Sequence, residues 1–275
     1  MPNEEIQALL LKADQSDVKA MIKLADLYRS LGEEEKAFKY LYKSTLYFSP
    51  EGERKLGFYY ERGIGVEKNL VKAKDYYERA AMHGDIKAKY NIGLFYYRNK
   101  QNYQAFNYVK ESANADYTKA ILLLAFFYEH GIGCEQSYQL SLECLLKCLE
   151  RGEKGIYHRL GMYAYYGYGM DKDLAKAFDY LYNGANEEEK ECFYHLGVMF
   201  SKGEGTKKDM TKAFYWYSKG ANSGDPRSMY NLAIYYENGV YVPKDLDKAK
   251  YWLSESAKAG FDLAINKLQI EEISK

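Results

Sequence analysis

An apolar residue recurs along this chain at a nearly constant interval, and each time alanine or glycine follows it. The steps between neighbouring anchors are 32, 36, 32, 36, 36 and 36 residues. A period of this size is typical of stacked helical hairpins, each of which buries its apolar face against its neighbours. The seven anchors are Leu24, Leu56, Ile92, Leu124, Leu160, Leu196 and Leu232.

A second anchor, small in every repeat, follows the first after 13 or 17 residues. From each second anchor to the next leucine or isoleucine the separation is always 19 residues, and even Ala249 is followed at that distance by Leu268. The separation from the second anchor to the next first anchor is thus constant, whereas the gap from the first to the second anchor differs by four residues. This is expected of two helices joined by a loop of variable length. The second anchors are Ala37, Ala73, Ala105, Ser141, Ala177, Ala213 and Ala249.

Each repeat therefore predicts two helices, A around the first anchor and B around the second. In most repeats an aromatic residue stands four positions after the first anchor, as Tyr60 follows Leu56, so that both lie on one helix face. The alanine or glycine after the anchor predicts that a neighbouring helix approaches the backbone closely at that point.

The five longer repeats carry a glycine-rich loop between helices A and B, of which Gly63-Ile64-Gly65 is one example. Its first glycine suits the left-handed backbone just past a helix end. Four residues before the second anchor stands a good N-cap residue, whose side chain can accept a backbone N–H at the start of helix B. These residues are Asn69, Ser137, Asp173, Asp209 and Asp245. The two shorter repeats lack both features, which predicts tighter turns.

One repeat combines all of these motifs. It contains Tyr194-His195-Leu196-Gly197, Gly203-Glu204-Gly205, Asp209-Met210-Thr211-Lys212-Ala213 and Trp216-Tyr217. In this form it resembles the Sel-one-like repeat, a subclass of the tetratricopeptide-like solenoids, and the resemblance extends over nearly the whole chain. It implies a protein–protein scaffold or adaptor and, in bacteria, sometimes a protein that regulates or neutralises a partner.

The pattern and the resemblance together predict an all-α protein, a right-handed α/α solenoid of about seven helix-turn-helix repeats over residues 18–261. Residues 6–17 fit the end of a helix B, and residues 262–275 fit a lone helix A that caps the array. Such half-repeats shield apolar faces that no neighbour covers. Since no linker rich in Ser, Gly or Pro interrupts the array, we expect a single domain over residues 1–275.

Composition narrows the classes of partner. The 39 basic and 39 acidic residues give a net charge of zero, so no overall attraction to nucleic acid or to an anionic membrane is expected. No apolar run approaches the ~20 residues that span a bilayer, and the first residues lack the basic start and apolar core of a signal peptide. We therefore expect a cytoplasmic protein without nucleic-acid binding or membrane insertion, with free cysteine thiols.

Few residues suggest chemistry. The Gly-x-Gly loops follow a helix, whereas a nucleotide-binding loop needs a preceding strand. His158 and His195 fall in consecutive A helices and could share a metal ion, but no Cys or carboxylate at ligand spacing completes a site. Cys144 and Cys148 are expected to be small core residues, since nothing nominates a base beside them. We predict no catalytic residue, no metal and no cofactor, and hence no enzyme.

The candidate partner-binding residues lie in the A helices. In tetratricopeptide-like solenoids the A helices line the concave face, and the position two before the anchor tends to point into it. Tyrosine, arginine, histidine and asparagine at this position and at the one that follows it would suit a binding groove. The candidates are Tyr90, Asn91, His158, Tyr194, His195, Tyr230 and Asn231. The alternative that these tyrosines only pack between adjacent A helices remains open.

The leading functional hypothesis is a non-catalytic scaffold or adaptor that binds a protein or peptide partner in the concave groove. A second hypothesis is a dedicated neutralising protein that blocks one toxin or enzyme. An enzyme of unknown type is the third.

Overall fold

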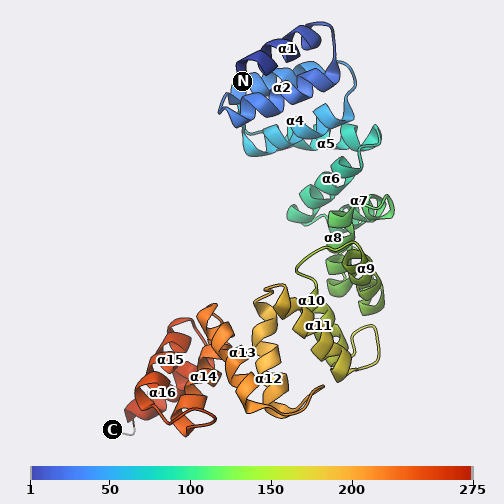
Figure 1. Ribbon diagram of the computed structural model, residues 1–275. Helices are drawn as coiled ribbons and strands as arrows, with labels where there is room; N and C mark the ends of the chain where they lie inside the picture. Colours follow the sequence, from blue (N-terminus) through green and yellow to red (C-terminus); the bar gives the residue numbers. More distant parts are fainter. Residues whose placement is uncertain (1, 274–275) are drawn as a thin grey trace. The chain divides into compact units, whose positions relative to one another are not determined.

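The computed structural model describes residues 2–273, and every regular element within that range is an α-helix (Figure 1). This confirms the predicted all-α fold of helix-turn-helix repeats. The chain divides into two compact units, an N-terminal unit that ends at Ser137 and a C-terminal unit that begins at Tyr138. Residues 274 and 275 of the predicted capping segment lie outside the described residues.

The helices follow one another in order through each unit. The N-terminal unit contains α1 (Pro2–Asp14), α2 (Val18–Ser30), α3 (Glu34–Thr45), α4 (Pro50–Arg62), α5 (Leu70–Met82), α6 (Ile86–Arg98), α7 (Asn102–Asn114) and α8 (Thr118–His130). The C-terminal unit contains α9 (Tyr138–Glu150), α10 (Tyr157–Tyr166), α11 (Leu174–Asn186), α12 (Glu191–Lys202), α13 (Met210–Asn222), α14 (Pro226–Asn238), α15 (Leu246–Lys258) and α16 (Asp262–Ile273).

Within each unit, helices that follow one another in the chain pack together. The hairpins α2/α3, α4/α5 and α6/α7 form the N-terminal unit, and α10/α11, α12/α13 and α14/α15 form the C-terminal unit. Helix α1 packs on α2 and begins before the predicted residue 6, and α16 packs on α15, as half-repeats at the two ends. The remaining predicted hairpin, α8 with α9, is divided between the units, and a single array over residues 1–275 stays a prediction.

The anchors form the cores of the repeats. Leu56 and the second anchor Ala73 are fully buried, and each of the other first anchors is also buried. Removing one leucine side chain from water contributes about 2 kcal/mol. The small residue after the anchor allows the predicted close approach, because a Cβ atom on Gly57 would lie only 2.8 Å from the ring of Tyr77 in helix B.

One buried position departs from the apolar pattern. Glu53 on α4 is fully buried, and it accepts hydrogen bonds from Arg79 Nη2 at 2.9 Å and shares one with His83 Nδ1 at 2.7 Å. A buried carboxylate without partners would be strongly destabilising. Arg79 on α5 and His83, the residue that follows this helix, therefore join α5 to α4 through a polar contact.

The loops obey the local rules that the sequence predicted. Each helix A of the five longer repeats ends at a left-handed glycine, for example Gly203 with φ of 78°. Four of the five predicted N-caps accept a hydrogen bond from the backbone N–H three residues later, and Ser137 directly precedes α9. The four are Asn69, Asp173, Asp209 and Asp245, at 2.9 to 3.0 Å.

The second glycine of each loop joins neighbouring repeats. A Cβ atom on Gly205 would lie 2.0 Å from the carbonyl oxygen of Leu174, the first residue of the preceding helix B. A Cβ atom on Gly65 would likewise lie 2.2 Å from the carbonyl oxygen of Glu34, the first residue of α3. In the last loop Tyr241 takes this place with a φ of 66°, and its ring lies 5.7 Å from that of Phe214. The loop of a longer repeat thus rests on the first turn of the preceding helix B.

We expect Gly205→Ala to destabilise the protein by more than about 3 kcal/mol, because the new methyl group overlaps backbone atoms and the residue must also keep a left-handed conformation. Gly224→Ala is the matched control, since Gly224 has a φ of 91° but no atom within 4 Å of its added Cβ. That change should cost about 1 kcal/mol. Urea unfolding followed by far-UV circular dichroism gives both values, and equal shifts would contradict the loop contact.

Candidate functional site

A cleft of about 200 Å³ opens in the C-terminal unit between the consecutive A helices α10 and α12. Helix α11 closes it from behind through Leu181. The side chains that line it are Tyr165, Tyr166, Leu181, Tyr194, His195, Val198, Met199 and Lys202. Two of the predicted contact residues, Tyr194 and His195, are therefore part of its wall.

Two tyrosines from the last turn of α10 form one edge of this cleft. The hydroxyl of Tyr165 donates a hydrogen bond to Glu204 Oε2 at 2.8 Å, and this bond, together with burial, raises the pKa of Tyr165 to about 12. Tyr166 is 55% exposed, yet its ring lies 5.1 Å from that of Tyr165 and 5.4 Å from that of Tyr168. The exposed ring is thus held in place by its aromatic neighbours.

The two histidines that the sequence singled out meet in the structure. The rings of His158 and His195 lie 5.1 Å apart between centroids. Burial lowers the pKa of His195 to about 4, and the neighbouring His158 and Arg227 add to this effect. Burial also lowers the pKa of His158, whose Nε2 atom is buried without a hydrogen-bond partner. Near neutral pH both imidazoles are uncharged and present one donor and one acceptor nitrogen each.

Tyr194 is fixed from the next repeat. The guanidinium carbon of Arg227 lies 4.3 Å from the centroid of the Tyr194 ring, which is a cation–π contact. Arg227 Nε in turn donates to Asp225 Oδ1 at 3.0 Å. Asp225 also caps α14 by accepting a hydrogen bond from the backbone N–H of Ser228 at 2.9 Å. The orientation of Tyr194 therefore depends on the start of α14.

The other two predicted tyrosines each pack on an aromatic residue that directly precedes the next helix A. The ring centroids of Tyr230 and Phe261 are 5.5 Å apart, and those of Tyr90 and Tyr117 are 5.4 Å apart. Both tyrosines are half-buried. Contacts between repeats thus cover part of each tyrosine ring. Contact between the uncovered part of each ring and a partner stays a prediction.

The predicted asparagines lie beside these tyrosines. Asn231 Nδ2 donates to the backbone carbonyl of Arg227 at 2.8 Å, one helical turn earlier, and Asn91 is half-buried on α6. The structure therefore brings His158, Tyr194 and His195 together. It places Tyr230 and Asn231 further along the C-terminal unit, and Tyr90 and Asn91 in the N-terminal unit.

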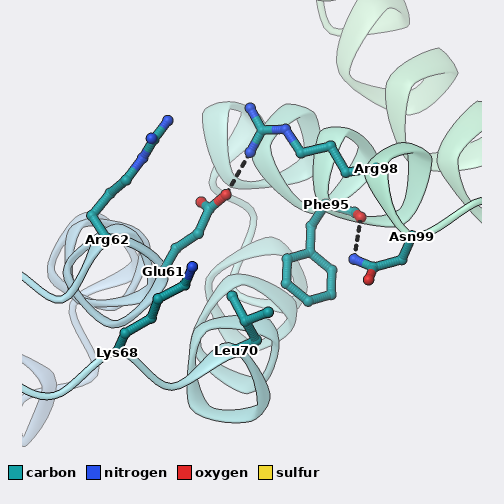
Figure 2. Close-up of a pocket in the computed structure, with 7 residues that line it drawn as sticks. All are labelled: Glu61, Arg62, Lys68, Leu70, Phe95, Arg98 and Asn99. Atoms are coloured by element: carbon teal, nitrogen blue, oxygen red, sulfur yellow. Dashed lines mark hydrogen bonds and ion pairs between the residues drawn. The ribbon is translucent and has the colours of Figure 1, made fainter.

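A larger cleft, of about 540 Å³, lies in the N-terminal unit (Figure 2). It is bounded by the ends of α4 and α6 and by the start of α5, and is lined by Glu61, Arg62, Lys68, Leu70, Phe95, Arg98 and Asn99. Glu61 is the fixed point of this cleft, because its two carboxylate oxygens accept hydrogen bonds from Arg98 Nη1 at 2.5 Å and from the Tyr77 hydroxyl at 2.8 Å. Figure 2 shows the Glu61–Arg98 pair, with Arg62 extending away from it.

The short third repeat explains why this cleft exists. In longer repeats the Gly-x-Gly loop covers the first turn of the preceding helix B, and Leu174 at that position is half-buried. The third repeat is four residues shorter between its anchors, so no such loop reaches the first turn of α5, and Leu70 is 44% exposed. Within the described residues, α15 is not followed by a repeat of the longer kind. Its first residue, Leu246, is 59% exposed and lines a cleft of about 270 Å³.

Two arginines beside this larger cleft share one aromatic ring. The guanidinium carbon of Arg29 lies 5.3 Å from the centroid of Phe58, and that of Arg62 lies 5.8 Å from the same centroid. The candidate residues predicted from the sequence do not include Phe58, Arg62, Lys68 or Leu70. The shortened third repeat was the available signal, since it implies an uncovered first turn on the preceding helix B.

Within residues 2–273, no group of three or more His, Cys, Asp and Glu side chains is placed to hold a metal ion. In the same range no helix has the length and apolar content needed to cross a membrane. The side chains of both clefts offer aromatic faces, cations and neutral imidazoles, which are groups that recognise other molecules by contact.

Comparison with known proteins identifies the repeat. The family model described as the Sel1 repeat matches residues 18–45, 50–85, 118–152, 157–187, 193–225 and 226–261. The shorter third repeat, α6 with α7, is not among the matched segments.

Among curated proteins, a sel1-like repeat-containing protein of Acanthamoeba polyphaga mimivirus is 38% identical over 76 residues, which are 28% of this chain and 14% of that protein. The ERAD-associated E3 ubiquitin-protein ligase component HRD3B of Arabidopsis thaliana is 32% identical over 99 residues, which are 34% of this chain and 15% of that protein. The chain thus spans about one seventh of the length of these relatives.

Two solved structures share the fold. A Sel1 repeat protein from Oxalobacter formigenes has a TM-score of 0.72 at 26% identity, over 86% of this chain and 96% of that one. A protective antigen of uropathogenic Escherichia coli that displays an SLR fold has a TM-score of 0.86 at 23% identity, over 93% of this chain and 56% of that one.

The histidine pair predicts a pH-dependent stability. The folded pKa of His195 is about 4, below its value of 6.5 in an unfolded chain, so the unfolded state takes up the proton first as the pH falls. Stability should decrease from neutral pH toward pH 5, and His195→Gln should remove on the order of 1 to 2 kcal/mol of this decrease. Urea titrations of both proteins at the two pH values test this, and identical pH dependence would contradict a buried neutral His195.

Proposed function

The chain belongs to the Sel1 repeat family, and we propose that it works as a non-catalytic scaffold that binds a protein or peptide partner through the inner faces of its A helices. Sel1 repeats generally mediate protein–protein interactions. One relative, HRD3B, is by its name a component of a ligase assembly, although this chain spans only 15% of it.

The observation that carries the proposal is the cleft between α10 and α12, with its fixed and exposed Tyr166. Tyrosine offers a large contact area with only two rotatable side-chain bonds, so little entropy is lost when it binds. Neighbouring rings already restrict Tyr166, which reduces that loss further. In this proposal Tyr166 contacts an apolar group of the partner.

The polar groups of the cleft would orient the partner. Lys202 is exposed at the rim, 3.7 Å from Glu204, and can approach a partner carboxylate. His195 is neutral and can bond a backbone amide of a bound segment. Tyr194 lies beside both, with its ring beneath Arg227. The proposal also includes, as secondary contact residues on the inner faces of the A helices, His158, Tyr90, Asn91, Tyr230 and Asn231.

The test is affinity capture from lysate of the cells that encode the protein, with wild-type bait beside Tyr166→Ala/Lys202→Ala. The partner should be retained by the wild type and lost by this variant, with purified components showing a loss of about 1–4 kcal/mol in binding free energy. The matched control is Tyr251→Ala/Lys207→Ala, because Tyr251 is 56% exposed on α15, outside the cleft.

The same experiment separates the competing hypotheses. Several partners held with modest affinity support an adaptor, whereas one partner held with sub-nanomolar affinity identifies a dedicated neutralising protein. If both variants retain the same partners as the wild type, binding through this cleft is wrong.

A further inference from the structure

The larger cleft of the N-terminal unit is positively charged at one side. On the adjoining face several basic groups are already satisfied, since Lys55 is paired with Asp26 and Arg98 with Glu61. Arg62 and Lys68 differ from these, because no carboxylate of the described residues lies within ion-pair distance of either one. The excess charge of this cleft therefore lies on these two exposed side chains.

Aromatic packing holds Arg62 near a second cation. Its guanidinium and that of Arg29 lie 5.8 and 5.3 Å from the centroid of Phe58, and Arg29 also lacks an ion-pair partner among the described residues. Both positive charges lie near one ring, so an anion that approaches this region is attracted by both. Arginine suits a carboxylate in particular, because its planar donors match the two oxygens.

The floor of the cleft is apolar. Leu70 is 44% exposed at the start of α5, and Phe95 of α6 faces the same space (Figure 2). In the longer repeats the equivalent space above helix B is filled by the Gly-x-Gly loop of the following repeat. In the third repeat no loop of the protein fills this space, so a segment of similar size from a partner can occupy it.

We propose that this cleft binds an acidic extended segment of a partner protein, which takes the place that the loop occupies in longer repeats. One apolar side chain of the segment lies on Leu70 and Phe95, and nearby carboxylates contact Arg62 and Lys68. Side chains two residues apart on an extended segment point to the same side, about 7 Å apart. Acidic residues at alternate positions can therefore present two carboxylates on the side of the segment that faces the cleft lined by Arg62 and Lys68. This inference rests on the proposed scaffold function and names the chemistry of one partner segment.

Carboxylates fit this cleft better than a nucleic acid. Glu61 lies within the cleft, and the acidic first turn of α3, with Glu34 and Glu35, lies against the α4–α5 loop at Gly65. A phosphate backbone carries a charge at every nucleotide and would meet these carboxylates. A peptide can place a few separate charges beside Arg62 and Lys68 and neutral residues elsewhere.

The probe is a short fluorescein-labelled peptide with glutamates at alternate positions around one leucine, titrated with the full chain and followed by fluorescence anisotropy. A peptide with glutamines in place of the glutamates should bind about tenfold more weakly or worse. Arg62→Gln/Lys68→Gln should weaken the acidic peptide by a similar factor, and added salt should weaken it in the wild type.

The control variant is Lys39→Gln/Lys207→Gln, which removes the same net charge at two exposed positions that do not line the cleft. It should bind the acidic peptide as the wild type does. A second variant inserts the longer loop, with its Gly-x-Gly sequence, between α6 and α7 to cover the first turn of α5. Binding should be lost while circular dichroism reports an unchanged helical fold.

Equal binding of the two peptides, or equal loss in the control variant, would overturn the inference. Tighter binding of a labelled single-stranded oligonucleotide, abolished by Arg62→Gln/Lys68→Gln, would assign the cleft to nucleic acid instead. Failure of the peptide while Tyr166→Ala/Lys202→Ala still abolishes capture would reject the acidic segment and leave the scaffold function standing.

Discussion

The contact between the backbone of helix A and a large side chain of helix B sets the geometry of the hairpins in which glycine follows the anchor. Where glycine follows the anchor, the ring or branched side chain of helix B lies against the backbone, as Tyr217 does at Gly197, where an added Cβ would be 2.5 Å away. Any larger residue there would push the helices apart and open the core. In these hairpins the short distance accompanies a fully buried anchor, as at Leu56 and Leu196.

Once the hairpin distance is fixed, the loop determines how the next hairpin joins. The second glycine of the loop touches a backbone carbonyl at the start of the preceding helix B, so the two backbones meet without a side chain between them. Leu174, which a loop covers, is half-buried, whereas Leu70, which no loop covers, stays exposed. The differences in surface between repeats thus arise where the loop of one repeat does or does not reach the preceding helix B.

Local features could be read from the sequence because they depend on nearby residues. The N-cap Asp209 acts on the N–H of Lys212, and Gly203 ends α12 through its own backbone conformation. The meeting of His158 and His195 could also be foreseen, since both occupy related positions in consecutive A helices. Fixed repeat spacing converts such positions into neighbours in space.

Contacts that depend on the direction of individual side chains could not be predicted from the sequence. Phe58 occupies a position that is apolar in most repeats, and nothing local shows that guanidiniums from α2 and α4 share its ring. Glu53 occupies a buried position because of Arg79 and His83, which lie 26 and 30 residues away. Tyr230 packs on Phe261, a residue between helices that belongs to neither predicted apolar face. The continuity of the array from one unit to the other stays a prediction.

The four-residue difference between long and short repeats carries an evolutionary consequence. The helices of a short repeat keep their anchors and their 19-residue spacing, so an in-frame loss of four codons in the loop leaves the hairpin intact. The loss changes the neighbouring surface, because the first turn of the preceding helix B, which the longer loop covered, becomes exposed. Small insertions and deletions in the gene can therefore open or close clefts on the surface one at a time, while the hairpins that carry them stay unchanged.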